Sequence, residues 1–154
     1  MLLTLQKQIA DAIGALPYFS GVTPITERAG DIETEIDQRL AEMQFCVVVQ
    51  TAQGEDHENP MMPEPLAAIY TERFVVSCAQ TPLTDEQAAN RNVVDGIEQI
   101  ILCLHGLPIA DDAIGRRVFR VKSHQSIRTD DGRAIQECVV EVIARLKPEP
   151  TRED

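Results

Sequence analysis

The sequence is short of aromatic and basic residues. It contains no tryptophan, its aromatic content is 4%, and 14 lysines and arginines stand against 25 aspartates and glutamates, for a net charge of −11. Binding along a nucleic-acid backbone requires cations that displace counterions from phosphates, and single-stranded bases are held by stacking on aromatic rings. These shortages argue against sequence-specific or general nucleic-acid binding and against sugar-binding sites built on aromatic rings.

Long apolar runs are missing as well. No stretch approaches the roughly 20 apolar residues that a membrane-spanning helix needs, and polar residues from Gln6 to Asp11 interrupt the N-terminal apolar segment, so no signal peptide or membrane partner is expected. The four cysteines show no CxxC spacing and no clustering with histidine. We predict buried, reduced thiols rather than zinc ligands or disulfides.

Recognised catalytic and nucleotide-binding motifs are absent, including GxGxxG, GxxxxGK[ST], GxSxG and HExxH. The weaker candidates have simpler interpretations. The tripeptide 56–58 is a solvated acidic loop, because three consecutive loop residues do not converge on a metal. His105 lies where a cation favours a helix C-terminus, His124 is an exposed strand residue, and residues 130–131 suit a turn. We therefore predict no enzyme, no catalytic residue, no metal and no cofactor.

The residues that are present favour one globular domain. The chain has 154 residues, of which 44% are hydrophobic, and this predicts a single α+β domain over residues 1–147 with a disordered tail over 148–154. Apolar spacing predicts helices over 2–16 and 31–43, and a third helix that opens at the capping box Thr84-Asp85-Glu86-Gln87 and ends at Gly106. A Val-rich segment at 45–49 predicts a central strand, and a second strand is expected over 67–79.

The C-terminal third predicts a β-hairpin. Alternating apolar residues on both sides of Thr129-Asp130-Asp131-Gly132 indicate two strands joined by a two-residue Asp131-Gly132 turn. That turn would set Lys122 opposite Glu141. We expect a mixed or antiparallel sheet of about four strands that ends in this hairpin, with about three amphipathic helices packed mainly on one face.

Charge is strongly segregated along the chain. Residues 116–133 hold six cations and two carboxylates, a net charge of +4, whereas residues 1–115 hold five cations and 18 carboxylates, a net charge of −13. One interpretation is a solvated strand face. The other is a contact between copies, in which this basic patch meets an acidic patch on the next copy and assembles a ring that weakens with salt. The candidate subunit-interface or lumen residues are Arg116, Arg117, Arg120, Lys122, His124, Arg128 and Arg133.

Residues 53–66 form a long acidic segment with three prolines and no periodicity, which predicts a loop. It is either a solvated loop or an arm that docks on a partner, since proline limits the entropy lost on ordering and methionine makes adaptable contacts. The candidate docking residues are Glu55, Asp56, Glu58, Met61, Met62 and Glu64.

The order of these segments resembles a known family. An N-terminal helix (LLTLQKQIADAIGAL), an acidic helix leading into a Val-rich strand (EIDQRLAEMQFCVVVQ), a second strand (AAIYTERFVVSCAQ), a helix (NVVDGIEQIILCLHGL) and a closing hairpin over residues 119–146 are similar to the tail terminator, or tail completion, proteins of long-tailed bacteriophages and Mu-like prophages. The resemblance covers residues 2–147 and rests on length, element order and texture. The long acidic loop has no counterpart that we can align.

The resemblance implies an α+β protein that forms a hexameric ring, caps the end of the tail tube, stops its polymerisation and provides the surface that joins the head. It implies a tail tube protein and a head-completion or connector protein as partners, no catalytic residues, and a location in the host cytoplasm during assembly and then at the head-proximal end of the virion tail. In such a ring, the basic strand would line a passage for DNA.

Three alternatives stay open from the sequence. The first is another phage neck or head–tail connector component. The second is a small acidic bacterial binding or adaptor domain, and the third and weaker one is an enzyme that lacks recognised motifs.

Overall fold

The computed structural model describes residues 2–56, 68–81, 91–109 and 117–146. These ranges contain the helices α1 (Leu2–Gly14), α2 (Ile32–Met43) and α4 (Val93–Leu104), and the short 3-10 helices η1 (Pro17–Phe19) and η2 (Glu27–Ala29). The strands are β1 (Phe45–Asp56), β2 (Ala68–Gln80), β3 (Arg120–Arg128) and β4 (Ala134–Leu146). They form one antiparallel sheet in the order β1-β2-β4-β3. The predicted α+β class is confirmed.

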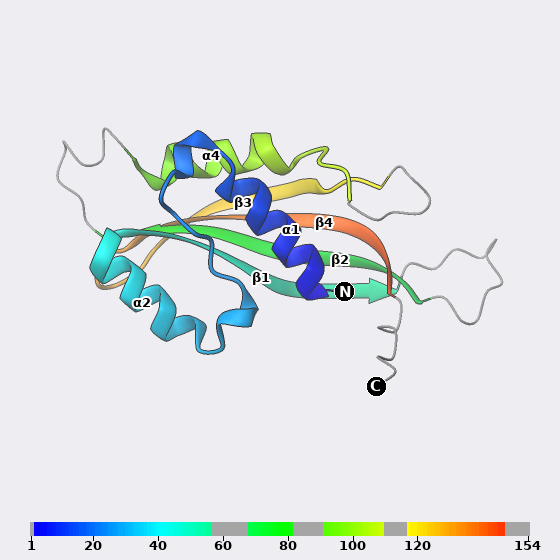
Figure 1. Cartoon of the computed structure of the whole chain (residues 1–154), viewed down its shortest axis with the longest axis horizontal. Helices are drawn as coiled ribbons and strands as arrows, with labels where there is room; N and C mark the ends of the chain where they lie inside the picture. Colours follow the sequence, from blue (N-terminus) through cyan, green and yellow to red (C-terminus); the bar gives the residue numbers. More distant parts are fainter. Residues whose placement is uncertain (1, 57–67, 82–90, 110–116, 147–154) are drawn as a thin grey trace.

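The helices cover the two faces of the sheet unequally (Figure 1). α1 and α4 lie on one face, where their apolar side chains form the main core with residues from every strand or its flank. α2 lies on the opposite face near the start of β1, and Leu40 packs there with Cys46 and Val48 in a second, smaller cluster. Two of the three described α-helices therefore share one face, as the sequence indicated.

The first two helices follow their apolar spacing. Leu5, Ile9 and Ile13 recur every four residues in α1 and are all buried, because this spacing puts them on one side of a helix. In α2, the side chain of Asp31 accepts a hydrogen bond from the Thr34 backbone N–H and so caps the first turn. The predicted helices at 2–16 and 31–43 are confirmed, the first ending two residues early.

The prediction that residues 45–49 form a central strand is wrong, because β1 is at the edge of the sheet. Its residues are apolar on both sides for another reason. Val47 and Val49 face the main core, while Cys46 and Val48 face α2. The outer edge is also covered: the Ile25 N–H donates to Val47 O and the Val49 N–H donates to Ile25 O, each at 2.8 Å. A strand buried in this way has the composition of a central strand.

The predicted loop at 53–66 begins later than expected. β1 continues to Asp56, and its residues Gln53–Asp56 pair with β2 residues from Arg73 to Tyr70 after an irregularity between Thr51 and Gln53. The polar composition of Gln53–Asp56 does not predict a strand, because an exposed strand end has no alternation of apolar and polar residues. The rest of the predicted loop, like the predicted disordered tail at 148–154, lies outside the described residues.

The third helix has a different cap from the one predicted. α4 begins at Val93, and the Asn92 side chain caps it by accepting a hydrogen bond from the Asp95 N–H at 2.8 Å. The predicted capping box at 84–87 therefore does not open this helix, and these residues lie outside the described ranges. The predicted end is confirmed, since Gly106 directly follows the C-cap with a φ of 86° that favours glycine.

The hairpin is confirmed, but its predicted register is wrong. The last pair is Arg128 with Ala134, so residues Thr129–Arg133 form the connection in place of a two-residue turn. A second shift at Lys122, a β-bulge, brings Arg120 rather than Lys122 opposite Glu141. The bulge also divides the apolar residues of β3 between the two faces of the sheet. The apolar alternation within β3 cannot reveal this bulge, because it does not show that Lys122 lacks a partner residue on β4.

Candidate functional site

β3 is the edge strand that the sequence singled out by its charge, and all of its residues except Val121 are exposed. Its edge is covered only near its start. There the Phe119 N–H donates to Leu107 O and the Gly106 N–H donates to Phe119 O, each at 2.8 Å. From Lys122 to Arg128, no segment of the described chain pairs with the outer edge. Such an edge presents backbone donors and acceptors for another strand.

His105 marks the end of the covered part of this edge. Its Nδ1 atom accepts a hydrogen bond of 3.1 Å from the Val121 backbone N–H, so that nitrogen carries no proton in this arrangement. The ring joins the end of α4 to β3. This differs from the predicted role as a cation at a helix C-terminus, since the ring follows the helix and acts as an acceptor.

The predicted basic residues divide into two groups. Four of them lie on β3 with exposed side chains, and these are Arg120, Lys122, His124 and Arg128. Arg133 instead bonds within its own chain, to Asp37 at 3.0 Å and to Asp131 at 3.2 Å. Arg117 donates to the Ile143 carbonyl at 3.4 Å, and Arg116 lies outside the described residues. The charges available for a partner are therefore those of β3.

The turn beside β3 confirms the interpretation of residues 130–131. The Thr129 hydroxyl donates to the Asp131 carboxylate, and the Thr129 N–H donates to Arg133 O at 3.1 Å. The hydroxyl bond is the main reason that the pKa of Asp131 lies below its usual value. Gly132 takes a φ of 84° here, which favours glycine.

Carboxylates gather on α2 and at the far end of β1. α2 and its cap carry five carboxylates and one arginine, and Asp31, Glu33, Asp37 and Glu42 are exposed. In β1, Glu55 lies 3.2 Å from Arg73, which also lies 3.2 Å from Glu141 on β4. These ion pairs are the main reason that the pKa of Arg73 is raised.

The predicted docking loop is described only at its first residues. Glu55 is exposed, and Asp56 ends β1. The other candidates, Glu58, Met61, Met62 and Glu64, lie outside the described residues.

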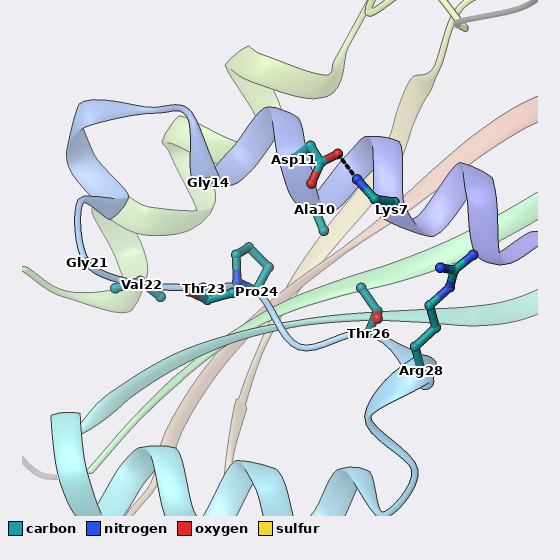
Figure 2. Close-up of a pocket in the computed structure, with 10 residues that line it drawn as sticks. All are labelled: Lys7, Ala10, Asp11, Gly14, Gly21, Val22, Thr23, Pro24, Thr26 and Arg28. Carbon is teal, nitrogen blue, oxygen red and sulfur yellow. Dashed lines mark hydrogen bonds and ion pairs between the residues drawn. The ribbon is translucent and has the colours of Figure 1, made fainter.

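A groove of about 540 Å³ lies between α1 and residues 21–28 (Figure 2). Its lining includes small residues such as Gly14, Gly21 and Pro24. Lys7 and Asp11 face each other across one turn of α1 at 2.7 Å, so their charges cancel. No sequence pattern indicates this groove, because its lining comes from two segments that only the fold brings together.

Glu72 is an unexpected buried carboxylate. It lies on the core side of β2, is only 4% exposed, and receives no hydrogen bond or ion pair from the described residues. Burial raises its pKa. Gly54 on the neighbouring strand makes room for it, since a Cβ there would lie 2.6 Å from its carboxylate oxygens. The even positions from Ala68 to Cys78 are otherwise apolar, so this alternation contained a signal for the buried carboxylate.

The four cysteines are free, and three of them, Cys46, Cys78 and Cys138, are buried. Burial raises the pKa of Cys46 to about 11 and that of Cys138 to about 12. Thiols in this state are poor nucleophiles at neutral pH. Cys103 is half-buried.

No group of three or more His, Cys, Asp or Glu side chains among the described residues could hold a metal ion. None of the described helices has the length and apolar character to cross a membrane.

Comparison with protein-family models gives no match, and no curated protein matches the chain. Two solved structures from Akkermansia muciniphila are similar in part. One shows 12% identity and a TM-score of 0.28 over 75% of this chain and 50% of its own, so this chain spans half of its length. The other, solved without its transmembrane region, shows 9% identity and a TM-score of 0.30 over 94% of this chain and 86% of its own. Likeness at this level carries no argument about function.

Proposed function

We propose that the chain is a structural phage protein that assembles into a ring, caps the tail tube, ends its polymerisation and offers the surface that joins the head. One observation carries the proposal. β3, at one edge of the sheet, holds three cations and no carboxylate, while α2, which packs on the strand at the other edge, is strongly acidic. The family resemblance given above supplies the particular role at the tail tube.

Opposite charges on different surfaces of one molecule favour a heterologous contact. When a basic surface of one copy meets an acidic surface of the next, repetition produces a closed ring or an open filament, depending on the rotation between copies. Arg128 and Lys122 on β3 are exposed and form no ion pair among the described residues. The α2 carboxylates Glu33 and Glu42 are likewise exposed and form no ion pair among these residues. All four charges are therefore available to a neighbouring copy.

A ring ends tube growth if its two faces differ. One face matches the last ring of the tail tube protein, while the other lacks a second copy of that surface and instead receives a head-completion or connector protein. The protein would assemble in the host cytoplasm and remain at the head-proximal end of the virion tail. Basic side chains of β3 that reach the lumen would let DNA pass without binding a particular sequence.

Charge reversal tests the ring. Mass photometry and negative-stain microscopy at low salt are expected to show a six-fold ring with a central hole. The double variant Lys122→Glu with Arg128→Glu is expected to be monomeric, because it reverses two of the three exposed positive charges of β3. A matched control, Lys7→Glu with Arg28→Glu, makes the same change of net charge on α1 and η2 and should still form the ring.

A compact wild-type monomer at low salt would overturn the ring and favour a small adaptor domain. The capping role has its own assay. The ring, added to polymerising tail tube protein, should stop tube elongation as seen by electron microscopy. A ring that leaves tube length unchanged would instead indicate another neck component.

A further inference from the structure

Within the described residues, two stretches of sheet edge have no pairing segment, and they lie on opposite sides of the sheet. On β3 the open stretch is Lys122–Arg128, beyond the part covered by residues 105–109. On β1, Ile25 and the Glu27 side chain cover the edge as far as Thr51, whose N–H donates to Glu27 Oε1 at 2.6 Å. Residues Ala52–Glu55 are exposed, and no described segment pairs with the outer edge of Ala52–Asp56.

We infer that these two stretches pair with each other between neighbouring copies, so that the ring is held by a continuous β-sheet. This inference rests on the proposed ring and assigns the acidic side of its contact to the end of β1 instead of to α2. The occupant of the β3 edge is then the end of β1 from a second copy of this chain.

The charges of the two stretches are complementary. The β3 stretch contains Lys122 and Arg128 and no carboxylate, whereas the β1 stretch ends in Glu55 and Asp56 and contains no cation. Charged edges usually prevent strands from pairing between molecules. Here the charges repel a like edge and attract the other one, so they select head-to-tail pairing over pairing of two identical edges.

Strand direction is also complementary. The sheet has four strands and every neighbour is antiparallel, so β1 and β3 run in opposite directions. A second copy in the same orientation therefore brings its β1 antiparallel to the β3 of the first. No inversion is needed, which is the condition for copies related by one rotation axis.

The two stretches are offset along the strands by an amount that suits closure. Through the strand pairing, Gln53 is level with Glu141 on β4, and Gln125 is level with Glu137, so both lie on the same face of the sheet. These β4 residues are four positions apart, or about 14 Å, across four strands that span about 19 Å. Joining the stretches would tilt the strands by roughly 35°, at the lower end of the range of about 35–45° that closed sheets adopt.

Cysteine cross-linking tests the pairing. In a Cys103→Ala background, Gln53→Cys is combined in turn with Ser123→Cys, Gln125→Cys or Ile127→Cys, since all four positions lie on the α2 side of the sheet. Mild oxidation should give at least one combination a ladder of covalent oligomers on a denaturing gel, up to the size of the ring. The matched control Gln53→Cys with Ser126→Cys places the thiols on opposite faces and should stay largely monomeric, as should each single variant.

The outcomes separate this inference from the proposed function. A ring by mass photometry without a cross-link in any of the three combinations would overturn the strand pairing and leave the ring proposal standing. Equal cross-linking of the Ser126→Cys control would also overturn it, because ordered strands keep the two faces apart. A monomer at every concentration would overturn both.

Discussion

Two buried polar side chains, Gln6 and Glu72, show how single residues shape this core. Gln6 is fully buried and satisfied: its Nε2 donates to Thr51 Oγ1 at 2.6 Å, and its Oε1 accepts from the Glu27 N–H at 3.1 Å. It thereby joins α1 to β1 and to the segment that covers the β1 edge. Glu72 is buried as well, but the described residues offer it no partner. The two therefore have opposite effects on stability.

Substitution of Gln6 by leucine is expected to lower the free energy of unfolding by about 1–3 kcal/mol, because it leaves the Thr51 hydroxyl and the Glu27 N–H without their partner. Chemical denaturation measures the change. The double variant Gln6→Leu with Thr51→Val should recover part of the loss, since it removes the Thr51 hydroxyl, one of the two groups left without a hydrogen-bond partner. A double variant as unstable as the sum of the two single variants would contradict this explanation.

Substitution of Glu72 by glutamine is expected to raise the midpoint of thermal unfolding at pH 7. The pKa of Glu72 is higher in the folded chain than its ordinary value of 4.5, so protonation favours folding. The contribution of Glu72 to stability is fully present below pH 4.5 and is lost as the pH rises through the raised pKa. At neutral pH the buried carboxylate costs stability, which glutamine avoids.

Unfolding curves from pH 4 to pH 8 check the direction in which the stability contribution of Glu72 changes with pH. The difference between the wild type and Glu72→Gln should grow as the pH rises and then level off. A wild type that gains stability relative to Glu72→Gln with rising pH would contradict the assignment.

Helix α4 shows what decides stability at the scale of an element. Its first turn depends on Asn92, whose side chain caps the helix. The Tyr18 hydroxyl also holds the backbone of Asn92: the hydroxyl accepts a hydrogen bond from the Asn92 N–H at 2.9 Å and donates one to Asn92 O at 3.0 Å. The start of α4 is thus fixed both by its own sequence and by η1. Its core side carries Ile97, Ile100 and Leu104, all buried.

Asn92→Ala is expected to lower the free energy of unfolding by about 1 kcal/mol, the usual cost of a lost N-cap. Asn92→Ser is the matched comparison, because a serine side chain also caps helices well. It should cost clearly less than Asn92→Ala. Equal losses for the two variants would contradict the capping role of Asn92.

At the scale of the whole molecule, the two edges of the sheet differ in charge and in cover. No described segment pairs with the basic edge of β3 over Lys122–Arg128. The edge of β1 is covered by Ile25 and Glu27 as far as Thr51, and no described segment pairs with its acidic end. A monomer with a net charge of −11 would repel its copies on average. Local contact between opposite charges overcomes this repulsion only where the surfaces fit.

Assembly should therefore weaken with salt. Exposed charges are screened over about 10 Å at 0.1 M ionic strength and about 3 Å at 1 M. Mass photometry from 0.05 to 1 M sodium chloride should show a shift from ring toward monomer, and sodium sulfate at matched ionic strength should give the same trend. A ring that gains stability with added salt would indicate an apolar contact instead of the charged one proposed here.

Local features of this protein are determined by sequence alone. The apolar spacing of α1, the Asp31 cap of α2, the glycines at 106 and 132 and the α+β class all depend on neighbours a few residues away, so their signals lie within one segment. The basic character of β3 is likewise visible in the sequence.

What the tertiary structure decided is how the segments meet. β1 has the composition of a central strand because α2 and Ile25 cover it, and the bulge at Lys122 moves Arg120 opposite Glu141. Residues 105–109 determine which part of the β3 edge stays open. These outcomes depend on backbone pairing between distant segments, and a periodic pattern reports which side chains are buried but not which segment buries them.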